Sequence, residues 1–330
     1  MRFHCKNCKF PAKLKNGADF RTAKCPKCGH PLNLTREERT FGQYELLETL
    51  GSGGFGTVLK VREEQTESLF TLKLIKKASV STTEQVHLLR QIHSSRRLQH
   101  SSVVAAHGYG EKDDYWYLVS DYVDGLPLNH WAREFAPDPH RCVEICAQIG
   151  DALEYIHQQG FVHRDLKPGN IIMDLEGRPH IIDFGLCKSE EEGDLMAIER
   201  YRAARLAIQD GKHVSGKSML GTPGYAAPEQ LDGDALFANS QSDIYSLGVI
   251  LYELLSGKRP STGIGRIFDG PVLSSKLRGR IDAKAAARLR NLCMKALSHK
   301  CNKRHAGASV FAQECRDLLA AGQESIPSVS

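Results

Sequence analysis

The sequence lacks any long hydrophobic run. Its most apolar stretch, from Leu247 to Leu255, is interrupted by Tyr252 and Glu253 and is too short for a helix that would need about 20 apolar residues to span a bilayer. The first residues, Met1 to Cys5, also lack the apolar segment of a signal peptide. We therefore expect a soluble, cytoplasmic protein that has no membrane partner.

The sequence also lacks internal repeats and coiled-coil heptads. Its 330 residues, 41% hydrophobic and 25% charged, are typical of a globular protein with room for a two-lobed enzyme and a small appendage. Charge is divided unevenly, because residues 1–34 carry eight Lys or Arg against Asp19 alone, a balance of +7. Since the whole chain has a net charge of +5, the remainder sums to about −2 and is near neutral.

The ten cysteines lack the distribution of a disulfide framework. Four of them form two Cys-x-x-Cys pairs, Cys5 with Cys8 and Cys25 with Cys28, separated by sixteen residues, and the others are scattered. Each pair can form a knuckle that directs two thiolates at one metal ion, and the spacer is long enough to bring the knuckles together. The pattern predicts a tetrahedral zinc ion held by these four cysteines.

Residues 1–34 resemble the short zinc ribbons found at the N-termini of some bacterial proteins. Four thiolates leave no position for water, so the zinc is interpreted as structural, and His4 and His30 as neighbours of ligands. One alternative is a redox dithiol, but that motif normally lies in a larger α/β unit. Another is that the four cysteines have no special role, but so short a segment would then lack the metal or cross-link that it needs to fold. The basic charge fits a protein or a nucleic-acid partner, or simple solvation.

Residues 35–43 are predicted to be a linker, polar and charged from Thr35 to Thr40, and from Phe41 to Leu50 the chain becomes apolar with strand character. The glycine-rich string from Gly51 to Val58 is weak by itself, because dinucleotide-binding folds use similar strings. Here the string is followed by a strand, from Val58 to Val61, and no helix begins there. This favours a hairpin whose backbone amides approach ATP phosphates over a Rossmann turn.

Two further motifs carry most of the functional information. The chain contains His163-Arg164-Asp165-Leu166-Lys167-Pro168-Gly169-Asn170, followed by Asp183-Phe184-Gly185. With the glycine-rich string, they resemble the catalytic centre of the eukaryotic-like serine/threonine protein kinases, bacterial members included, over residues 44–320. The resemblance implies an α+β, bilobal kinase fold with a β-rich small lobe (44–122), a helical large lobe (126–320) and a flexible tail (321–330).

In that family, ATP and Mg²⁺ are the cofactors and proteins are the substrates. The resemblance implies that Asp165 orients the substrate hydroxyl, Lys167 steadies the γ-phosphate, and Asn170 and Asp183 hold magnesium. Lys167 and the stretch Gly221 to Tyr225 are similar to the serine/threonine class. A kinase of small molecules is the alternative, which is disfavoured by the stretch Gly221 to Glu229, the peptide platform in protein kinases.

The resemblance also implies an ATP-binding set in the small lobe and hinge. Lys73, in the apolar run Leu69 to Ile75, would contact the α- and β-phosphates, and Ser120 would be the gatekeeper. Thr71 stands where the family usually has alanine. The implied contacts are Gly51, Ser52, Gly53, Gly54, Phe55, Gly56, Val58, Lys73, Ser120, Asp121 and Val123.

The helix predicted between Ser81 and Leu98 departs from the family. Gln91 occupies the position of the glutamate that pairs with the strand lysine, and an amide forms a weaker link than a carboxylate. The alternative to an active kinase is thus a low-activity or pseudokinase scaffold that recruits a partner through the ribbon. The retained Asp165, Asn170 and Asp183 favour the enzyme.

Regulation is predicted in the segment between Asp183 and Glu229. Residues 189–218 are predicted to be an insertion, either a docking or autoinhibitory helix or a solvated, mobile loop. The regulatory candidates, besides Gln91, are Arg164 as receptor of an activation-loop phosphate, Ser215 and Ser218 as autophosphorylation sites, and Thr222 as a residue of the substrate pocket. Scaffold roles are implied for Asp243, which would anchor the catalytic loop, and for Glu229, which would pair with Arg304.

Overall fold

The computed structural model describes residues 3–14, 16–53, 56–79, 98–183, 188–189, 222, 224–231, 238–260 and 282–323. The chain divides into two compact units, Met1–Gln99 with Val104–Val123, and His100–Val103 with Asp124–Ser330. Among the described residues, no helix combines the length and apolarity needed to cross a membrane.

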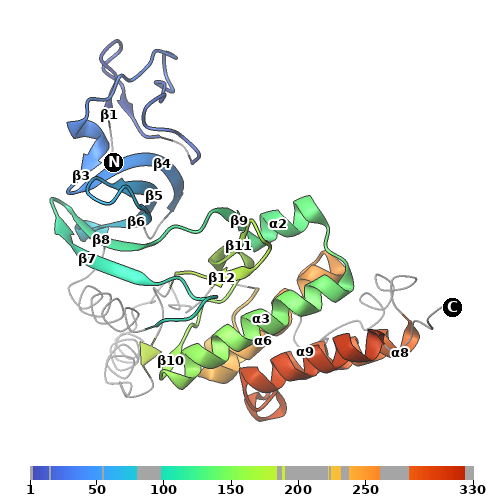
Figure 1. The fold of residues 1–330 in the computed structure, drawn as a ribbon. Helices are drawn as coiled ribbons and strands as arrows, with labels where there is room; N and C mark the ends of the chain where they lie inside the picture. Colours follow the sequence, from blue (N-terminus) through green and yellow to red (C-terminus); the bar gives the residue numbers. More distant parts are fainter. Residues whose placement is uncertain are drawn as a thin grey trace, which may run out of the picture. The chain divides into compact units, whose positions relative to one another are not determined.

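The first unit is built on a six-stranded antiparallel sheet in the order β3-β4-β5-β6-β8-β7 (Figure 1). Its strands have the alternating burial expected of a sheet with one face on a core, as at Leu59 and Val61 or at Leu72 and Leu74. The strands are β3 (Thr40–Phe41), β4 (Tyr44–Gly53), β5 (Gly56–Glu63), β6 (Leu69–Lys76), β7 (Ala106–Lys112) and β8 (Tyr115–Asp121). A 3₁₀ turn, η2 (Lys77–Ser79), follows β6.

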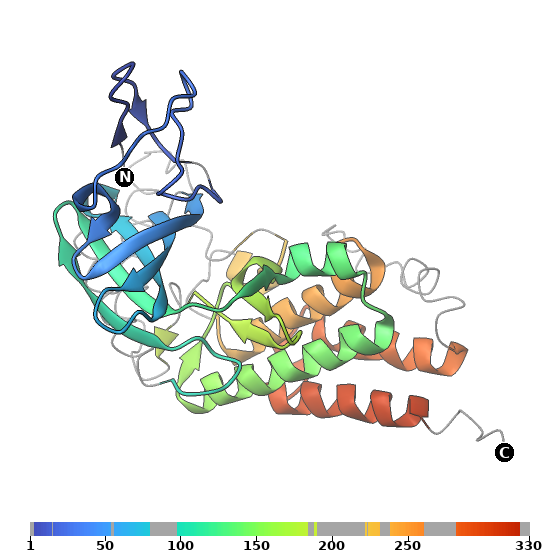
Figure 2. The same ribbon diagram turned by 45° about the horizontal axis from the view of Figure 1, so that its top comes forward.

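The ribbon belongs to this same unit and shares its core. Its own regular structure is one antiparallel pair, β1 (Phe3–His4) with β2 (Pro11–Ala12). Figures 1 and 2 show this N-terminal segment, in dark blue, beside the edge of the sheet at β3 and β4. One continuous hydrophobic cluster joins ribbon residues to sheet residues: Phe3, Cys5, Ala12, Leu14, Phe20, Ala23, Cys25, Leu32, Phe41, Leu46, Leu59, Val61, Leu72, Leu74 and Val119.

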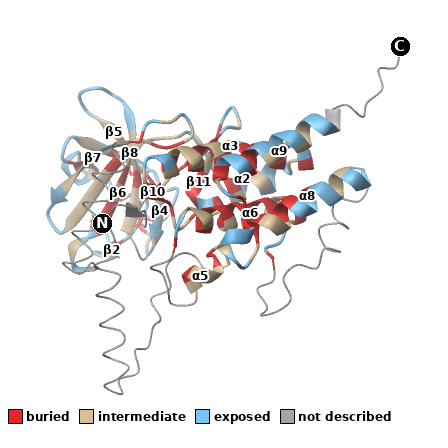
Figure 3. Ribbon diagram, turned by 90° about the horizontal axis from the view of Figure 1, so that it is seen from below, coloured by how far each residue is buried: buried red, intermediate tan, exposed pale blue. Residues whose placement is uncertain are grey.

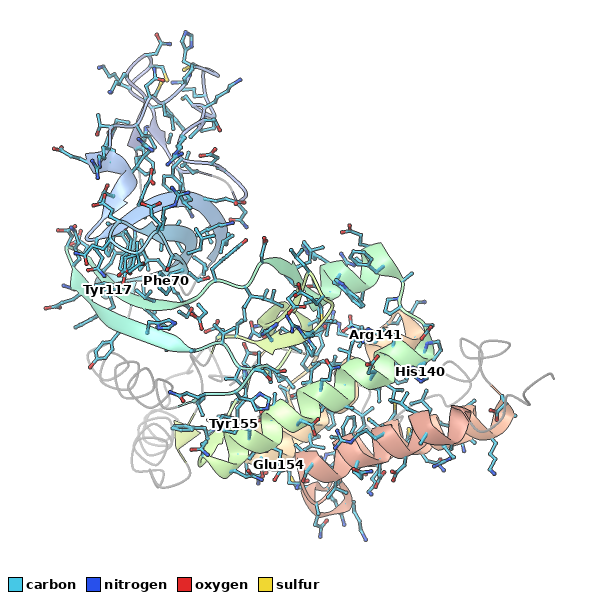
Figure 4. The ribbon with its side chains drawn as sticks, in the orientation of Figure 1. Phe70, Tyr117, His140, Arg141, Glu154 and Tyr155 are labelled. Atoms are coloured by element: carbon cyan, nitrogen blue, oxygen red, sulfur yellow. The ribbon has the colours of Figure 1, made fainter. Side chains whose placement is uncertain are left out.

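The predicted linker is folded. Thr35 and Glu38 exchange side-chain to backbone hydrogen bonds of 2.8 and 3.2 Å, a reciprocal cap on the 3₁₀ turn η1 (Glu37–Arg39). Phe41 then enters the core, where its ring packs against Tyr117 in a T-shaped arrangement with centroids 5.5 Å apart. Figure 4 labels Tyr117 and Phe70 on this sheet.

The second unit is mainly helical. Its helices are α2 (Leu128–Phe135), α3 (Pro139–Gln158), α5 (Pro228–Leu231), α6 (Ser240–Ser256), α8 (Ala283–Ala296) and α9 (Ala308–Gln323), with 3₁₀ turns η3 (Pro168–Asn170) and η5 (Cys301–Lys303). Its strands are β9 (Gly125–Pro127), β11 (Ile171–Asp174) and β12 (Pro179–Ile181) in one sheet, and the pair β10 (Phe161–Val162) with β13 (Lys188–Ser189). Helix α9 continues three residues into the segment predicted to be a tail, and residues 324–330 lie outside the described residues.

Helix α6 forms the centre of this unit. It begins three residues before Asp243, at a capping box between Asn239 and Ser242, and ends at Gly257, whose φ is 72°. Most of its residues are buried, red in Figure 3, as expected for a helix that is apolar nearly all round. Helix α3 lies against α6 and α9, and on it Glu154 (Figure 4) accepts the Ser309 N–H at the start of α9.

Candidate active site and metal centre

The glycine-rich hairpin joins β4 to β5. In its register Gly51 lies opposite Val58, Ser52 opposite Thr57, and Gly53 opposite Gly56. Gly54 and Phe55, between these strands, lie outside the described residues. The strand pairing confirms the predicted hairpin and excludes a strand-to-helix turn.

Gly56 is required by close packing in this hairpin. Its φ is 131°, and a Cβ added there would lie 2.1 Å from the backbone oxygen of Leu74. Only glycine therefore lets β5 start so close to β6. By contrast, a Cβ at Gly51 would meet no atom within 4 Å.

The other predicted nucleotide residues lie on the same sheet. Lys73, in β6, is paired with Val58 on β5 and with Leu118 on β8. The sheet therefore brings the lysine beside the hairpin, as the strand pattern predicts.

At the far end of β8, the gatekeeper candidate Ser120 lies opposite Thr71. Asp121 donates its N–H to Ala105 and its carboxylate hydrogen-bonds to the His107 imidazole. Val123 ends the first unit and is half-buried. The helix predicted to carry Gln91 lies outside the described residues.

In the second unit, Asp243 holds the catalytic loop. Its carboxylate, fully buried, accepts the backbone N–H groups of His163 and Arg164, both at 2.8 Å. His157, a residue that the sequence analysis missed, lies 2.8 Å from the same carboxylate through Nε2. Burial alone would raise the pKa of Asp243, but the His157 hydrogen bond and the His163 N–H lower it. The predicted anchoring role of Asp243 is thus confirmed.

Asp165, Lys167 and Thr222 form a triangle of hydrogen bonds. The Lys167 ammonium donates to Asp165 Oδ2 at 2.6 Å and to Thr222 Oγ1 at 2.7 Å. The Thr222 hydroxyl in turn donates to Asp165 Oδ1 at 2.7 Å. Both carboxylate oxygens of Asp165 therefore accept a hydrogen bond, which fixes the orientation of the group.

Of the two predicted magnesium residues, Asn170 lies three residues after Lys167, and Asp183 follows the strand pair β11 and β12. Asn170 donates its amide to the Asp165 carbonyl at 2.9 Å, and its own carbonyl accepts the N–H of Ile182 at 2.9 Å. Asp183 follows Ile182 directly, is exposed and has a left-handed φ of 63°. An amide and a carboxylate of this kind offer the oxygen ligands that Mg²⁺ prefers.

The ion pair implied between Glu229 and Arg304 is also confirmed. The guanidinium meets the carboxylate in two hydrogen bonds of 2.7 and 2.8 Å, and the Arg304 side chain is fully buried. Ser242, from the capping box of α6, adds a hydrogen bond of 2.7 Å to Glu229. The end of the activation segment is therefore tied to the helical core.

Among the regulatory candidates, Arg164 lies in the catalytic loop, and the structure describes its side chain. Its Nη2 donates to the Ala238 carbonyl at 3.0 Å, and its own carbonyl accepts the Gln230 amide at 2.8 Å. Ser215 and Ser218, like nearly all of the predicted insertion, lie outside the described residues. Thr222, predicted to shape the substrate pocket, belongs to the triangle with Asp165.

The four ribbon cysteines converge on one point. All their sulfurs lie within 4.8 Å of one another, and the Cys5–Cys28 and Cys8–Cys25 separations are both 3.6 Å. A tetrahedral ion bound at about 2.3 Å by four sulfurs would separate them by about 3.8 Å. The donor set and its spacing therefore fit one tetrahedral, thiolate-bound ion.

The two knuckles have the same backbone design. Lys9 N–H donates to the Cys5 carbonyl at 2.8 Å, and Gly29 N–H to the Cys25 carbonyl at 2.9 Å. Both turn residues have a left-handed φ, 57° and 73° respectively. The repeated turn places each pair of thiols on the same side of its knuckle.

Hydrogen-bond donors favour the thiolate of Cys28. The backbone N–H of His30 is the largest influence and the Asn7 amide adds to it, so that the pKa of Cys28 falls to about 6 despite the opposing effect of burial. Asn7 Nδ2 lies 3.7 Å from the sulfur. A thiol that ionises this readily is suited to bind a cation.

Comparison with known proteins identifies the family. Residues 44–316 match the protein kinase domain. The chain is 31% identical to the serine/threonine-protein kinase PrkC of Bacillus subtilis over 228 residues, 68% of this chain and 32% of PrkC. It is also 31% identical to the serine/threonine-protein kinase PknB of Mycobacterium tuberculosis over 247 residues, 72% of this chain and 36% of PknB. The chain belongs to the protein kinase family.

The fold agrees with this assignment. The crystal structure of the Mycobacterium tuberculosis PknI kinase domain superimposes with a TM-score of 0.62 at 23% identity, covering 84% of this chain and 96% of that one. The bilobal kinase fold that the sequence predicted is therefore confirmed. The chain spans about a third of the length of the two curated relatives.

Proposed function

We propose that the chain is an ATP-dependent serine/threonine protein kinase that phosphorylates protein hydroxyls, itself included. The observation that carries the proposal is the triangle of Asp165, Lys167 and Thr222, with hydrogen bonds of 2.6 to 2.7 Å. It joins a carboxylate that can accept the proton of a hydroxyl to a cation that can stabilise phosphate charge, and both functions support transfer of a phosphoryl group.

In the proposed reaction, the oxygen of a serine or threonine hydroxyl forms a bond to the γ-phosphorus of ATP. The bond from that phosphorus to the β–γ bridging oxygen breaks, and ADP leaves. Asp165 accepts the hydroxyl proton, and Lys167 steadies the γ-phosphate. Asn170 and Asp183 would hold magnesium, which neutralises charge on the phosphates when it is bound.

Nucleotide binding would rest on the sheet of the first unit. Backbone amides from Gly51 to Gly56 would approach the phosphates, and Lys73 would pair with the α- and β-phosphates. Ser120, Asp121 and Val123 would contact adenine. The adjacent positions of Lys73 and Val58 in the sheet support this part of the proposal.

The same proposal covers the ribbon and regulation. Cys5, Cys8, Cys25 and Cys28 would hold one structural zinc ion, supported by their sulfur separations. A phosphate added to Ser215 or Ser218 by autophosphorylation would form an ion pair with the Arg164 guanidinium. Gln91 would limit turnover, because its neutral amide cannot form an ion pair with Lys73.

The test is transfer of labelled phosphate from Mg-ATP to the chain itself and to a generic protein acceptor. We expect Asp165→Asn to abolish incorporation, whereas Asp151→Asn, at a half-exposed aspartate of α3 that pairs with Arg316, serves as the matched control. ATP binding without transfer to any protein would contradict the kinase assignment. A gain of rate in Gln91→Glu would identify Gln91 as a brake.

A further inference from the structure

The ribbon completes the edge of the kinase sheet immediately before the glycine-rich hairpin. Strand β3 pairs with β4 only at Tyr44 and Glu45. Farther along β4, Leu47 and Thr49 form backbone hydrogen bonds to ribbon residues 17–20. The ribbon thus takes the place of a neighbouring strand where β3 has ended.

Three backbone hydrogen bonds make this contact. Gly17 N–H donates to the Thr49 carbonyl at 2.6 Å, and Thr49 N–H donates to the Ala18 carbonyl at 3.2 Å. Phe20 N–H donates to the Leu47 carbonyl at 3.0 Å. The pairing is antiparallel, as the bridge between residues 19 and 48 confirms.

β4 is irregular at this point. Its register with β5 shifts between Leu46 and Glu48 and again between Thr49 and Gly51, so Leu47 and Leu50 have no opposite residue on β5. A bulged strand leaves backbone groups unpaired by its regular neighbour. The ribbon supplies the partner for one such group, the Leu47 carbonyl.

Side chains extend the contact toward both ends of the strand. Ser52, in the glycine-rich string, donates its hydroxyl to Asn16 Oδ1 at 3.4 Å. Arg21 holds the Glu45 carboxylate with two bonds of 2.8 and 3.0 Å. Residues 16–21 therefore contact β4 from its start to the glycine-rich turn.

The contact is connected to the metal centre through a short chain of buried groups. Phe20, which pairs with Leu47, packs against Phe3 in a T-shaped arrangement with ring centroids 5.7 Å apart. Phe3 precedes the ligand Cys5 by two residues, and all three ribbon side chains are buried. A ribbon that loses its metal ion also loses the support for this packing.

We propose that residues 16–21 are a positioning element for the glycine-rich strand, through which metal binding by the ribbon sets the affinity for Mg-ATP. The inference rests on the proposed kinase function of the same site. No residue of this element is assigned to the chemistry, so its effect falls on nucleotide binding and leaves the phosphoryl-transfer step unchanged.

A pair of matched variants tests the proposal. Gly17 and Gly42 both have left-handed φ, 75° and 63°, and a Cβ at either would meet no atom within 4 Å. Alanine therefore introduces the same backbone strain at both, but only residue 17 pairs with β4 beside the glycine-rich turn. Gly42 lies in the β3–β4 turn, at the other end of the strand.

We expect Gly17→Ala to raise the KM for ATP about three- to tenfold with kcat changed less than about twofold, whereas Gly42→Ala leaves both unchanged. The Kd for a non-hydrolysable Mg-ATP analogue should rise by the same factor. Amide hydrogen exchange in residues 44–53 should increase in Gly17→Ala and in the Cys8→Ser/Cys28→Ser variant. Both glycine variants should retain their metal.

The possible outcomes separate the two proposals. A native chain that binds the analogue but transfers no phosphate would contradict only the kinase function, because the binding and exchange measurements still apply. Equal effects of Gly17→Ala and Gly42→Ala, or unchanged affinity and exchange in Gly17→Ala, would overturn only the positioning role. A native chain that binds no nucleotide would overturn both.

Discussion

The Lys167 ammonium lies 2.6 Å from the Asp165 carboxylate, and the Thr222 hydroxyl bridges the two groups. This relationship joins the catalytic loop to the end of the activation segment, which is 55 to 57 residues away along the chain. A change in the conformation of that segment would therefore move the Thr222 hydroxyl and alter its hydrogen bond to Asp165, the proposed catalytic acid.

Thr222→Val should lower kcat about 10- to 100-fold, because it removes hydrogen bonds to two charged groups, worth about 1.5–3 kcal/mol. Thr222→Ser retains the hydroxyl and should keep most of the activity. The measurement is steady-state transfer to a protein acceptor, with KM for ATP measured in parallel. Near-native kcat in the valine variant would mean that the triangle does not orient Asp165.

Gly56→Ala should destabilise the first unit by about 2–4 kcal/mol, since the new Cβ meets backbone and the φ is unfavourable for alanine. Gly51→Ala is the control, because its Cβ has no neighbour within 4 Å. Denaturant unfolding with and without Mg-ATP measures both variants. Equal stability of the two would show that β5 can move away from Leu74.

Arg304→Met should cost about 3–5 kcal/mol of unfolding free energy, because it leaves the Glu229 carboxylate without its partner in a mostly buried site. The double variant Glu229→Gln/Arg304→Met removes the stranded charge and should recover part of this loss. Thermal and denaturant unfolding provide the comparison. If the double variant were less stable than Arg304→Met, the penalty would not come from an unpaired charge.

Asp174 should contribute a pH-dependent part of the stability. Burial would raise its pKa, but hydrogen bonds from His180 and from the Arg178 N–H and guanidinium lower it from 3.8 to about 2. Because the folded pKa lies below the unfolded one, the stabilisation is present above pH 3.8 and is lost as the pH falls toward 2.

The melting temperature of Asp174→Asn should therefore be lower than that of the native chain near pH 5, and the two should converge as the pH approaches 2. The exposed Asp113, replaced by Asn, is the matched control and should follow the native profile. A difference between Asp174→Asn and the native chain that stays constant from pH 5 to 2 would contradict the assignment.

Purified native chain should contain one zinc ion per molecule, and Cys8→Ser should lose it. Cys301→Ser, at another half-exposed cysteine, should retain the metal. Elemental analysis measures the content, and thermal unfolding should show a lower transition for Cys8→Ser because metal binding is coupled to folding of the ribbon. Zinc retained at full stoichiometry by Cys8→Ser would exclude a four-cysteine site.

The sequence was informative where function depends on residues close together in the chain. Asp165, Lys167 and Asn170 fall within one short loop, and the resemblance of that loop to kinases predicted that they share a site. Strand periodicity predicted the neighbourhood of Lys73, and the resemblance to kinases predicted the Glu229–Arg304 pair. Even so, the partner of Asp243 on α3, His157, had no local signal, because the contact spans 86 residues.

The docking of the ribbon could not be read from the sequence. It depends on backbone hydrogen bonds to Leu47 and Thr49, and such bonds are available to any residue type. The polar composition of residues 35–40 predicted a linker, whereas Thr35 and Glu38 cap a turn that brings Phe41 into the core. The docking of the ribbon and the fold of residues 35–41 both depend on contacts between residues far apart in the chain, which local propensity does not reveal.

The shared core means that the family boundary and the folding boundary of this protein differ. The match to the protein kinase domain starts at residue 44, after Phe41 and every ribbon residue of the core cluster. A truncated version that begins there would expose Leu46 and neighbouring apolar side chains of the sheet to water, and would free an edge for intermolecular pairing. Expression of the catalytic part for crystallography or inhibitor screening should therefore begin at the first residue of the ribbon, with zinc supplied during purification.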